Sequence, residues 1–406
     1  MTFEHPAPQE LILVLNCGSS SIKFALFDAA ADPPPRRPAW NGKVQGIGGT
    51  RPDFGETGVT AFPIDLDEAH PYRSALDLIL RRVRARLGQG RLVAAAHRVV
   101  HGGRRYSTPA RIDAATLEDL RSYIPLAPLH QPFALEAIDI LLRQQPELPQ
   151  IACFDTAFHH TMPQVEQMLP LPYDAWERGL RRYGFHGLSY EYLSIALAER
   201  HGELAHGRLI AAHLGSGASL CAMRELRSQA TTMGFSSLDG LMMGTRTGAL
   251  DPGALLYLME IERLSLEDVG RILYHESGLK GVSGISADPR DLLAAEAQAP
   301  RARLALDLYV RRIVREIGAL TAVLGGLDML VFTAGIGEHS VELRRRVCEG
   351  LAWLGVSLDP EANAAQATTL SIASSAVRVA MEPTNEEWVA ARHAGDLLAR
   401  ARATLS

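Results

Sequence analysis

The chain has few cysteines, and their spacing excludes two kinds of small structural site. Its four cysteines are scattered over 406 residues without a CxxC pair. The sequence therefore signals neither a zinc site nor a disulfide framework. Two of them, Cys153 and Cys221, stand in apolar stretches, and we expect them to be buried, unreactive thiols.

Two familiar nucleotide-binding signatures are also missing. The chain has no GxxxxGK[ST] segment, which excludes a P-loop NTPase by pattern, and it lacks the HRD motif of protein kinases. A formal net charge of −5 argues against nucleic acid as the main partner. No apolar run is long enough to span a bilayer, and the opening MTFEHPAPQE lacks the order of a signal peptide. We therefore expect a cytoplasmic protein without a membrane partner.

The most informative segment that is present is LILVLNCGSSSIKFALFD, residues 11–28. An apolar run, a turn of small polar residues and an alternating run predict a strand, a tight turn and a second strand. A Gly/Ser turn at a strand end lets backbone N–H groups and hydroxyls converge on an anion. Asn16, the serines and Lys23 therefore suit a site for phosphate and Mg²⁺.

A second segment repeats this arrangement. LIAAHLGSGASLCAMRE, residues 209–225, again predicts a strand, a Gly/Ser turn and a strand. The alternative is two ordinary hairpins with flexible turns, because short Gly-rich patterns have many false positives. As a pair, the hairpins suggest a duplicated fold that binds one phosphate chain between its halves.

The remaining pattern predicts α/β architecture in both halves, because strand-like and helical stretches alternate. The length suggests two domains, with a boundary near Pro146 and Pro149. We place the domains at residues 1–150 and 151–384, with a terminal helix over residues 385–406 returning to the first.

Several polar residues stand where strands end or turn, and each has a structural alternative. Arg98 lies inside an apolar strand, where it either makes a structural salt bridge or binds a carboxylate or phosphate. Asp155 ends another apolar run and is either a helix cap or a functional carboxylate. His186 lies between glycines and is either a core histidine or a site residue, whereas Arg246 in a Gly-rich turn is better suited to reading an anion.

Taken together, these segments resemble the acetate kinase family, a branch of the superfamily of acetate and sugar kinases, actin and the large heat-shock chaperones. The resemblance covers nearly the whole chain and rests on ten short motifs in the family's order: NCGSSSIKF, HRVVHGG, LAPLH, FDTAFH, YGFHG, HLGSGAS, MGFSSLDGLMMGTRTG, GVSGISADPR, FTAGIGE and PTNEE. It implies two duplicated actin-like (ribonuclease H-like) domains that flank an active-site cleft. It also implies a homodimer that phosphorylates acetate with ATP, using Mg²⁺ or, in its place, Mn²⁺.

The resemblance also implies roles for individual residues. Catalysis falls to Asp155, His186 and Arg246, with Asp155 read physically as a group that positions Arg98 or a Mg²⁺-bound water. Metal binding falls to Asn16 and Glu386. The acetate site comprises Arg98, Val100, Leu129 and Phe185. The nucleotide-binding residues are Lys23, His213, Leu214, Gly215, Ser216, Gly217, Asp288, Pro289, Arg290, Gly335, Ile336, Gly337, Glu338 and His339.

The chain departs from the family pattern at a few positions. Ser237 replaces a proline that borders the acyl pocket, which leaves the preferred acyl chain length open. Ser216 and His339 each replace an asparagine in a nucleotide segment, Gln131 replaces the Asn of LAPLHNP, and Ala249 replaces the Asp of TRTGD.

Two other functions remain open at this point. A propionate or other short-chain carboxylate kinase would use the same scaffold, and one methylene discriminates by only about 1–3 kcal/mol. An actin-like or chaperone-like ATPase would belong to a different class, but it has no need of an arginine buried beside the phosphate path.

Overall fold

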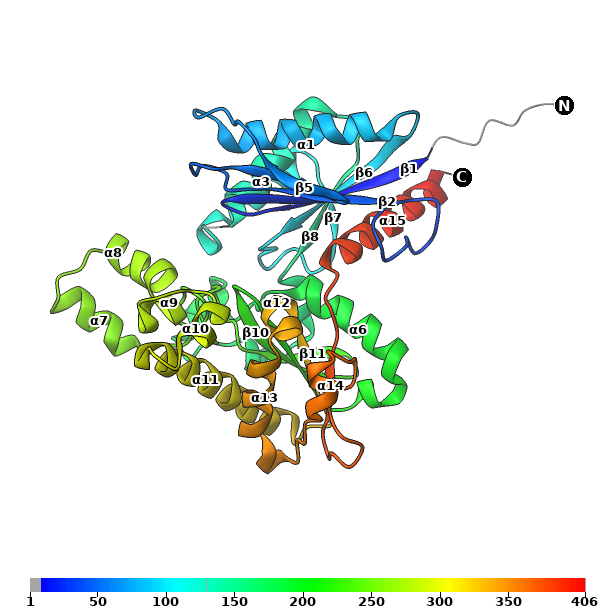
Figure 1. The fold of residues 1–406 in the computed structure, drawn as a ribbon. Coiled ribbons are helices and arrows are strands. Elements are labelled where there is room, and N and C mark those ends of the chain that lie inside the picture. The colour runs from blue at the N-terminus through cyan, green and yellow to red at the C-terminus, as the bar shows by residue number, and fades with distance from the viewer. Residues whose placement is uncertain (1–8, 129, 406) are drawn as a thin grey trace. The chain divides into compact units, whose positions relative to one another are not determined.

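A computed structural model describes residues 9–128 and 130–405 and divides the chain into two α/β units (Figure 1). The first unit runs to Ala157 and takes up the chain again from Asn385, and the second comprises Phe158–Thr384. The chain thus passes from the first unit to the second after Ala157. This point lies beyond the boundary expected near residue 150, because strand β8 (Gln150–Phe154) pairs with the sheet of the first unit. Mixed α/β architecture in both halves is confirmed.

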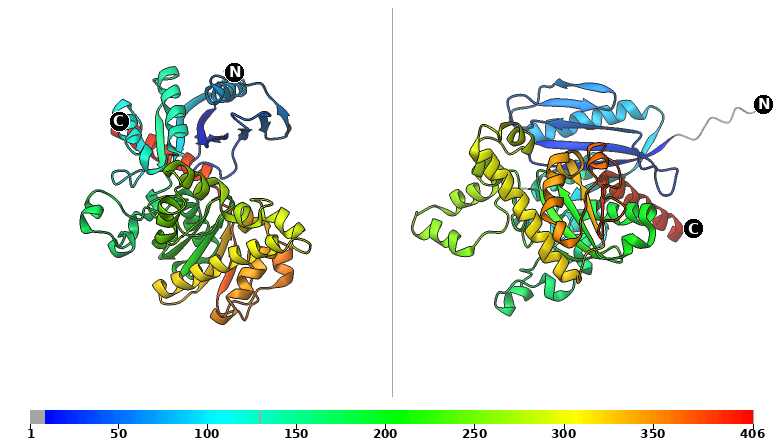
Figure 2. Two further views of the ribbon diagram at one scale, coloured as in Figure 1. Left: turned by 90° about the vertical axis from the view of Figure 1, so that its left-hand side faces the viewer. Right: turned by 60° about the horizontal axis from the view of Figure 1, so that its bottom comes forward.

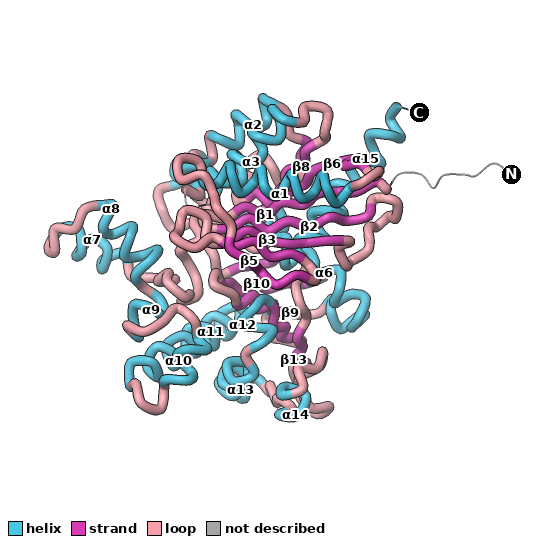
Figure 3. The backbone as a smooth tube through the Cα atoms, turned by 45° about the horizontal axis from the view of Figure 1, so that its top comes forward, coloured by secondary structure: helices cyan, strands magenta, loops and turns pink. Residues whose placement is uncertain are grey.

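The first unit is built on an eight-stranded sheet in the order β5-β4-β3-β2-β1-β6-β8-β7. The predicted first hairpin is present, since β1 (Glu10–Cys17) and β2 (Ser21–Asp28) are antiparallel neighbours (Figure 3). Strands β1, β6 and β8 are parallel. The other strands are β3 (Trp40–Gln45), β4 (Asp53–Glu56), β5 (Val59–Pro63), β6 (Arg91–Val99) and β7 (Ala110–Arg111).

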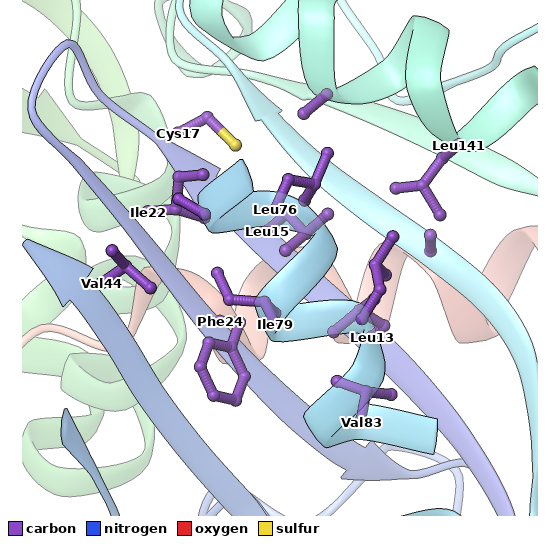
Figure 4. Close-up of a cluster of buried hydrophobic side chains, with 14 of the residues drawn as sticks. Leu13, Leu15, Cys17, Ile22, Phe24, Val44, Leu76, Ile79, Val83 and Leu141 are labelled. Carbon is purple, nitrogen blue, oxygen red and sulfur yellow. The ribbon is translucent and has the colours of Figure 1, made fainter. Parts of the chain in front are cut away.

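Helices cover both faces of this sheet, which explains the unbroken apolar run of β1. On one face, α1 (Pro71–Leu87) and α3 (Gln131–Gln144) pack against the side chains of β1 and β2 that point their way. Figure 4 shows Leu13, Leu15 and Phe24 packed with Leu76 and Ile79 of α1. On the other face lies α15 (Glu386–Leu405), from the far end of the chain (Figure 1).

The second unit repeats this plan on a five-stranded sheet in the order β11-β10-β9-β12-β13. Helix α6 (Gly187–His201) packs Tyr190, Leu193 and Leu197 against one face. The long helix α11 (Pro300–Leu324) runs along the sheet (Figure 2). The strands are β9 (Leu209–Leu214), β10 (Ala218–Arg224), β11 (Arg227–Thr231), β12 (Met329–Thr333) and β13 (Arg378–Met381).

The two sheets share one topology, so the predicted duplication is present in the strand pairing. In each, three successive strands form an antiparallel meander, and two further strands, parallel to the first of them, extend the sheet on its other side. Strands β1, β2, β3, β6 and β8 therefore correspond to β9, β10, β11, β12 and β13. The chain passes into the other unit after the last of these strands in both cases: α6 lies beyond β8, after η2, α4 and α5, and α15 directly follows β13.

One local element is not predicted from the sequence. Gly335 and Gly337, expected after a strand with a backbone open to a nucleotide, lie in the short helix α12 (Ala334–His339) directly after β12. Ala334 begins that helix with a left-handed φ of 63°, and this sharp turn lets a helix start where the strand stops.

The remaining helical segments connect these layers. No helix in the described ranges is both long and apolar enough to cross a membrane. The connecting helical segments of the first unit and of its junction with the second are α2 (Ala114–Arg121), η1 (Ile124–Leu126) and η2 (Ala157–Thr161). In the second unit they are α4 (Gln164–Gln167), α5 (Tyr173–Glu177), η3 (Gly202–His206), α7 (Pro252–Glu260), α8 (Leu266–Arg271), η4 (Ile272–Glu276), α9 (Gly278–Ser283), α10 (Pro289–Ala295), α13 (Val341–Gly350), η5 (Ala352–Leu354) and α14 (Pro360–Ala364).

Candidate active site

In the first unit, the predicted site residues gather where three parallel strands end. Asn16 is near the end of β1, Arg98 near the end of β6, and Asp155 directly follows β8. Parallel neighbours end at the same edge of a sheet, so residues far apart in sequence meet there. Arg98 is opposite Cys153 in the β6–β8 pairing, which places its side chain beside the end of β8.

Arg98 is the centre of this cluster. Its Nε donates to Asp155 Oδ1 at 2.9 Å, and its Nη2 donates to Asp155 Oδ2. Its Nη1 donates to Asn16 Oδ1 at 3.1 Å. Burial lowers the pKa of Arg98, but the Asp155 and Glu386 carboxylates more than offset this and raise it above the usual value. The guanidinium therefore stays charged, and the salt-bridge alternative for Arg98 is present in the structure.

Glu386 adds a second carboxylate to the cluster from the start of α15. Its Oε2 lies 3.9 Å from Arg98 Nε. Burial raises the pKa of Glu386 to about 7, with Asp155 and Glu387 adding to the rise and Arg98 and Lys23 opposing it. The cluster thus holds more negative charge than Arg98 alone neutralises, and this favours a bound cation.

The other predicted residues of this unit are more dispersed. Lys23 is exposed on β2 and opposite Asn16 in the β1–β2 pairing. Val100 is buried just after β6. Leu129 lies outside the described residues. Within those ranges, no group of three or more His, Cys, Asp and Glu side chains is arranged to hold a metal ion.

In the second unit, His186 is fixed at the start of α6. It is the N-cap of that helix, with a left-handed φ of 59°. A residue other than glycine in this region is strained and is held there only by its surroundings. Its Nδ1 is 2.8 Å from Ser219 Oγ, and its ring stacks on His213 with centroids 4.0 Å apart.

Gly217 brings His186 and Arg246 to one point. A Cβ built on Gly217 would lie 3.3 Å from His186 Nε2 and 3.8 Å from Arg246 Nη1. Both cationic or hydrogen-bonding groups therefore border the backbone of the second Gly/Ser turn. Ser216, beside it, is exposed at the tip of the turn. The structure thus brings His186, His213, Gly217 and Arg246 together.

Helix α12 holds one of the predicted nucleotide segments, and a buried arginine supports it. A Cβ built on Gly335 would meet nothing within 4 Å, so this backbone is open to approach. Beneath it, the fully buried Arg344 donates to the carbonyl oxygens of Gly337 at 2.9 Å and Glu338 at 2.6 Å. The Glu338 carboxylate in turn accepts from the Thr384 N–H at 3.1 Å.

The predicted segment at residues 288–290 has a local structural role. Asp288 is the N-cap of α10, where its carboxylate accepts from the Arg290 N–H at 2.9 Å, and it pairs with the exposed Arg290 side chain. This pairing lowers the pKa of Asp288. The Asp288 carboxylate and the Arg290 guanidinium therefore both stay charged. These contacts are local and do not involve the Gly/Ser turn at Gly217.

Residues around the predicted acyl pocket are held by backbone contacts. Phe185 is buried, and its carbonyl accepts from His159 Nε2 at 2.9 Å. The Ser237 carbonyl accepts from Arg246 Nη1 at 3.2 Å, so this departure from the family pattern adjoins a catalytic candidate. Gln131 is structural, because its side-chain amide bonds to both the N–H and the carbonyl of His101.

Two further residues of the motif segments, Ser219 and Tyr190, were not among the predicted site residues. Tyr190 is one helical turn from His186, a spacing that places two side chains on the same face. Its hydroxyl is 2.6 Å from Ser219 Oγ. The helical spacing alone was a usable signal for Tyr190, whereas Ser219 is revealed only by the β9–β10 pairing that sets it opposite His213.

The chain is similar to named proteins over nearly its whole length. The model of the Acetokinase family matches residues 11–392. An acetate kinase of Rhodopseudomonas palustris is 49% identical over 390 residues, which covers 95% of this chain and 97% of that protein. An acetate kinase of Nitrobacter hamburgensis is 46% identical over 395 residues, again covering 95% of this chain and 96% of that protein.

Solved structures agree with this likeness. The acetate kinase of Porphyromonas gingivalis superposes with a TM-score of 0.86 at 34% identity, covering 96% of this chain and all of that one. A propionate kinase of Francisella tularensis gives a TM-score of 0.87 at 34% identity, covering 95% of this chain and 98% of that one. The recognised fold, two actin-like units, is confirmed.

Replacing Asp155 with Ala should lower the free energy of unfolding of the first unit by about 3–5 kcal/mol, because the Arg98 charge loses its buried partner. Chemical denaturation followed by fluorescence measures this change. Glu118→Ala is the control, since its ion pair with Arg121 is exposed and should contribute less than about 1 kcal/mol. Equal losses in the two variants would show that the Arg98 charge does not depend on Asp155 for its stability.

Proposed function

This chain belongs to the acetokinase family, and from that premise we propose that it is an ATP-dependent acetate kinase. It transfers the γ-phosphoryl group of ATP reversibly to the carboxylate of acetate, giving acetyl phosphate and ADP. The observation that carries this proposal is the match to this family over nearly the whole chain. The five charged or titratable residues proposed for binding and catalysis are all present in the sequence. Arg98, Asp155 and Glu386 meet in one unit, and His186 and Arg246 meet in the other.

Arg98 is the proposed anchor for the acetate carboxylate. Asp155 takes donors of Nε and Nη2, and Asn16 takes one donor of Nη1. These bonds use three of the five N–H donors of a guanidinium, which leaves one N–H on each Nη for a substrate. A guanidinium matches a carboxylate through such paired donors. Acetate is already ionised near neutral pH, because its reference pKa is about 4, so no strong general base is needed. Asp155 therefore acts by orienting Arg98.

His186 and Arg246 are the proposed stabilisers of the transferred group. In the transition state, negative charge spreads over the three equatorial oxygens of the phosphoryl group. Donors fixed in advance where this charge develops are the largest source of rate enhancement in many enzymes. His186 Nε2 and Arg246 Nη1 converge on Gly217 of the second Gly/Ser turn, where backbone N–H groups add to the anion site.

Magnesium is the metal implied by the family, and the residues around Arg98 fit it. Mg²⁺ prefers oxygen ligands, few of them from protein, together with phosphates and waters. Asn16 Oδ1 and the Glu386 carboxylate supply such oxygens, and two carboxylates, Asp155 and Glu386, lie beside the one guanidinium of Arg98. When bound, Mg²⁺ neutralises charge on the phosphates. Mn²⁺ presents the same preference for oxygen and is proposed as a substitute.

A coupled assay tests this function directly. ATP, Mg²⁺ and acetate should yield acetyl hydroxamate when hydroxylamine traps the product, with ADP formed in equal amount. Propionate and butyrate are run in parallel. ADP without any hydroxamate would favour a plain actin-like ATPase, and no product with any short carboxylate would overturn the proposal.

Two arginine variants should separate binding from chemistry. Arg98→Ala removes a ligand used in the ground state and should raise KM for acetate well above any change in KM for ATP. Arg246→Ala removes charge that matters most in the transition state and should mainly lower kcat, by about 100-fold or more. Steady-state kinetics with each substrate varied measures both, and the same change in both parameters for both variants would contradict the assignment.

Ser237 is proposed to widen acyl tolerance toward propionate. Serine has less apolar volume than the proline of the family pattern and brings a hydroxyl that must be satisfied. Ser237→Pro should lower the ratio of kcat/KM for propionate over acetate by about fourfold, because one buried methylene contributes about 0.8 kcal/mol. Proline keeps the carbonyl that accepts from Arg246. Ser236→Ala is the neighbouring control, and a ratio unchanged in both variants would rule out this role.

We also propose that the chain forms a homodimer through the surface of α7 and α8. Helix α7 has no buried residue. Four apolar side chains on α7, directly after it or at the start of α8 are each more than half accessible to solvent: Leu256, Tyr257, Ile261 and Leu266. Exposed apolar clusters of this kind mark interaction sites. Light scattering should report a dimer for the native chain and a monomer for Leu256→Glu combined with Ile261→Glu. Leu304→Glu, on the exposed side of α11, should leave the dimer intact.

A further inference from the structure

Three hydroxyl and imidazole groups form a continuous chain behind His186. Tyr190 OH is 2.6 Å from Ser219 Oγ, and Ser219 Oγ is 2.8 Å from His186 Nδ1. The side chains of Tyr190 and Ser219 are fully buried. Buried hydroxyls of this kind must be satisfied by one another, since no solvent reaches them. The chain therefore has a direction that is set by the groups at its ends.

The donor at the closed end fixes that direction. Burial raises the pKa of Tyr190 well above its usual value, so the phenol keeps its proton. Ser219 Oγ is the hydrogen-bond partner of the buried Tyr190 hydroxyl in the described ranges. A buried phenol proton needs an acceptor, so the Tyr190 O–H donates to Ser219. The Ser219 O–H then donates to His186 Nδ1.

We propose that Tyr190 and Ser219 are positioning residues that hold His186 as the neutral Nε2–H tautomer, so that Nε2 donates a hydrogen bond to the phosphoryl group in transfer. An imidazole whose Nδ1 accepts a hydrogen bond carries its proton on Nε2. Nε2 is the atom that borders Gly217 beside Arg246. The identity of the acceptor rests on the proposed function, whereas the tautomer does not.

The ring is held in two further ways, which suits a donor that must be fixed before the reaction. The strained left-handed backbone of His186 aims the side chain, and the His213 ring lies against it with an angle of 13° between the planes. His213 is itself held through Nδ1 by Ser189 Oγ at 2.9 Å. His186 therefore donates without acquiring a charge, and Arg246 supplies the positive charge beside it.

Nitrogen NMR tests the tautomer without any catalysis. Long-range ¹H–¹⁵N spectra of the full chain at pH 8 distinguish Nε2–H from Nδ1–H imidazole, and His186→Gln identifies the signal. We expect a single Nε2–H form in the native chain and a mixture of tautomers in Tyr190→Phe, where Ser219 loses its donor. An Nδ1–H form or an imidazolium in the native chain would overturn the proposal.

Kinetics provides the second readout. Tyr190→Phe should lower kcat about 2- to 10-fold, the value of one hydrogen bond, with KM for ATP and acetate nearly unchanged. Ser219→Ala should lower kcat further, and Ser219→Thr should restore most of it. The control is Tyr309→Phe, because Tyr309 is also buried in the second unit and its hydroxyl has no hydrogen-bond partner among the described residues.

The outcomes separate the positioning role from the proposed function. If Tyr190→Phe and Tyr309→Phe have the same kcat, the positioning role is wrong even when acyl phosphate is formed. If the native chain forms no acyl phosphate, the function fails, while the NMR spectrum still decides the tautomer.

Discussion

The arrangement of polar side chains in the first unit depends on one guanidinium that is largely buried and always charged. Arg98 must be neutralised where it lies, and Asp155 does this with a forked pair of hydrogen bonds. Glu386 is then a second carboxylate beside one guanidinium, and burial raises its pKa to about 7. The proposed binding of a cation and of a substrate carboxylate depends on this local charge balance.

The second unit applies a different solution at the corresponding edge of its sheet. Its groups are His186, Arg246 and a glycine turn, with no buried carboxylate among them. The proposed roles divide in the same way: the metal and the substrate carboxylate are assigned to the first edge, and the phosphate oxygens to the second. Helices α6 and α15 both begin at residues of the candidate site, with His186 as the N-cap of α6 and Glu386 as the first residue of α15.

Much of this fold could be predicted from the sequence, because its strongest elements obey local rules. Both Gly/Ser hairpins are set by apolar periodicity and turn residues, and the structure confirms them. Helix α12 was missed because a left-handed Ala334 begins it, and backbone strain leaves no mark in composition. The contact of Arg98 with Asp155 joins residues 57 positions apart, so only the parallel pairing of β6 and β8 brings them together.

The return of α15 to the first sheet has a consequence for synthesis on the ribosome. The second unit is one contiguous stretch of chain, so all of its layers are available once residue 384 has emerged. The first unit begins earlier but is completed later, because α15 (20 residues) covers a face of β1 and is made after the second unit. The apolar residues of β1 on that face, Ile12 and Val14 among them, stay uncovered through most of translation and need protection from aggregation. The half of the protein that is made first is therefore the half that is finished last.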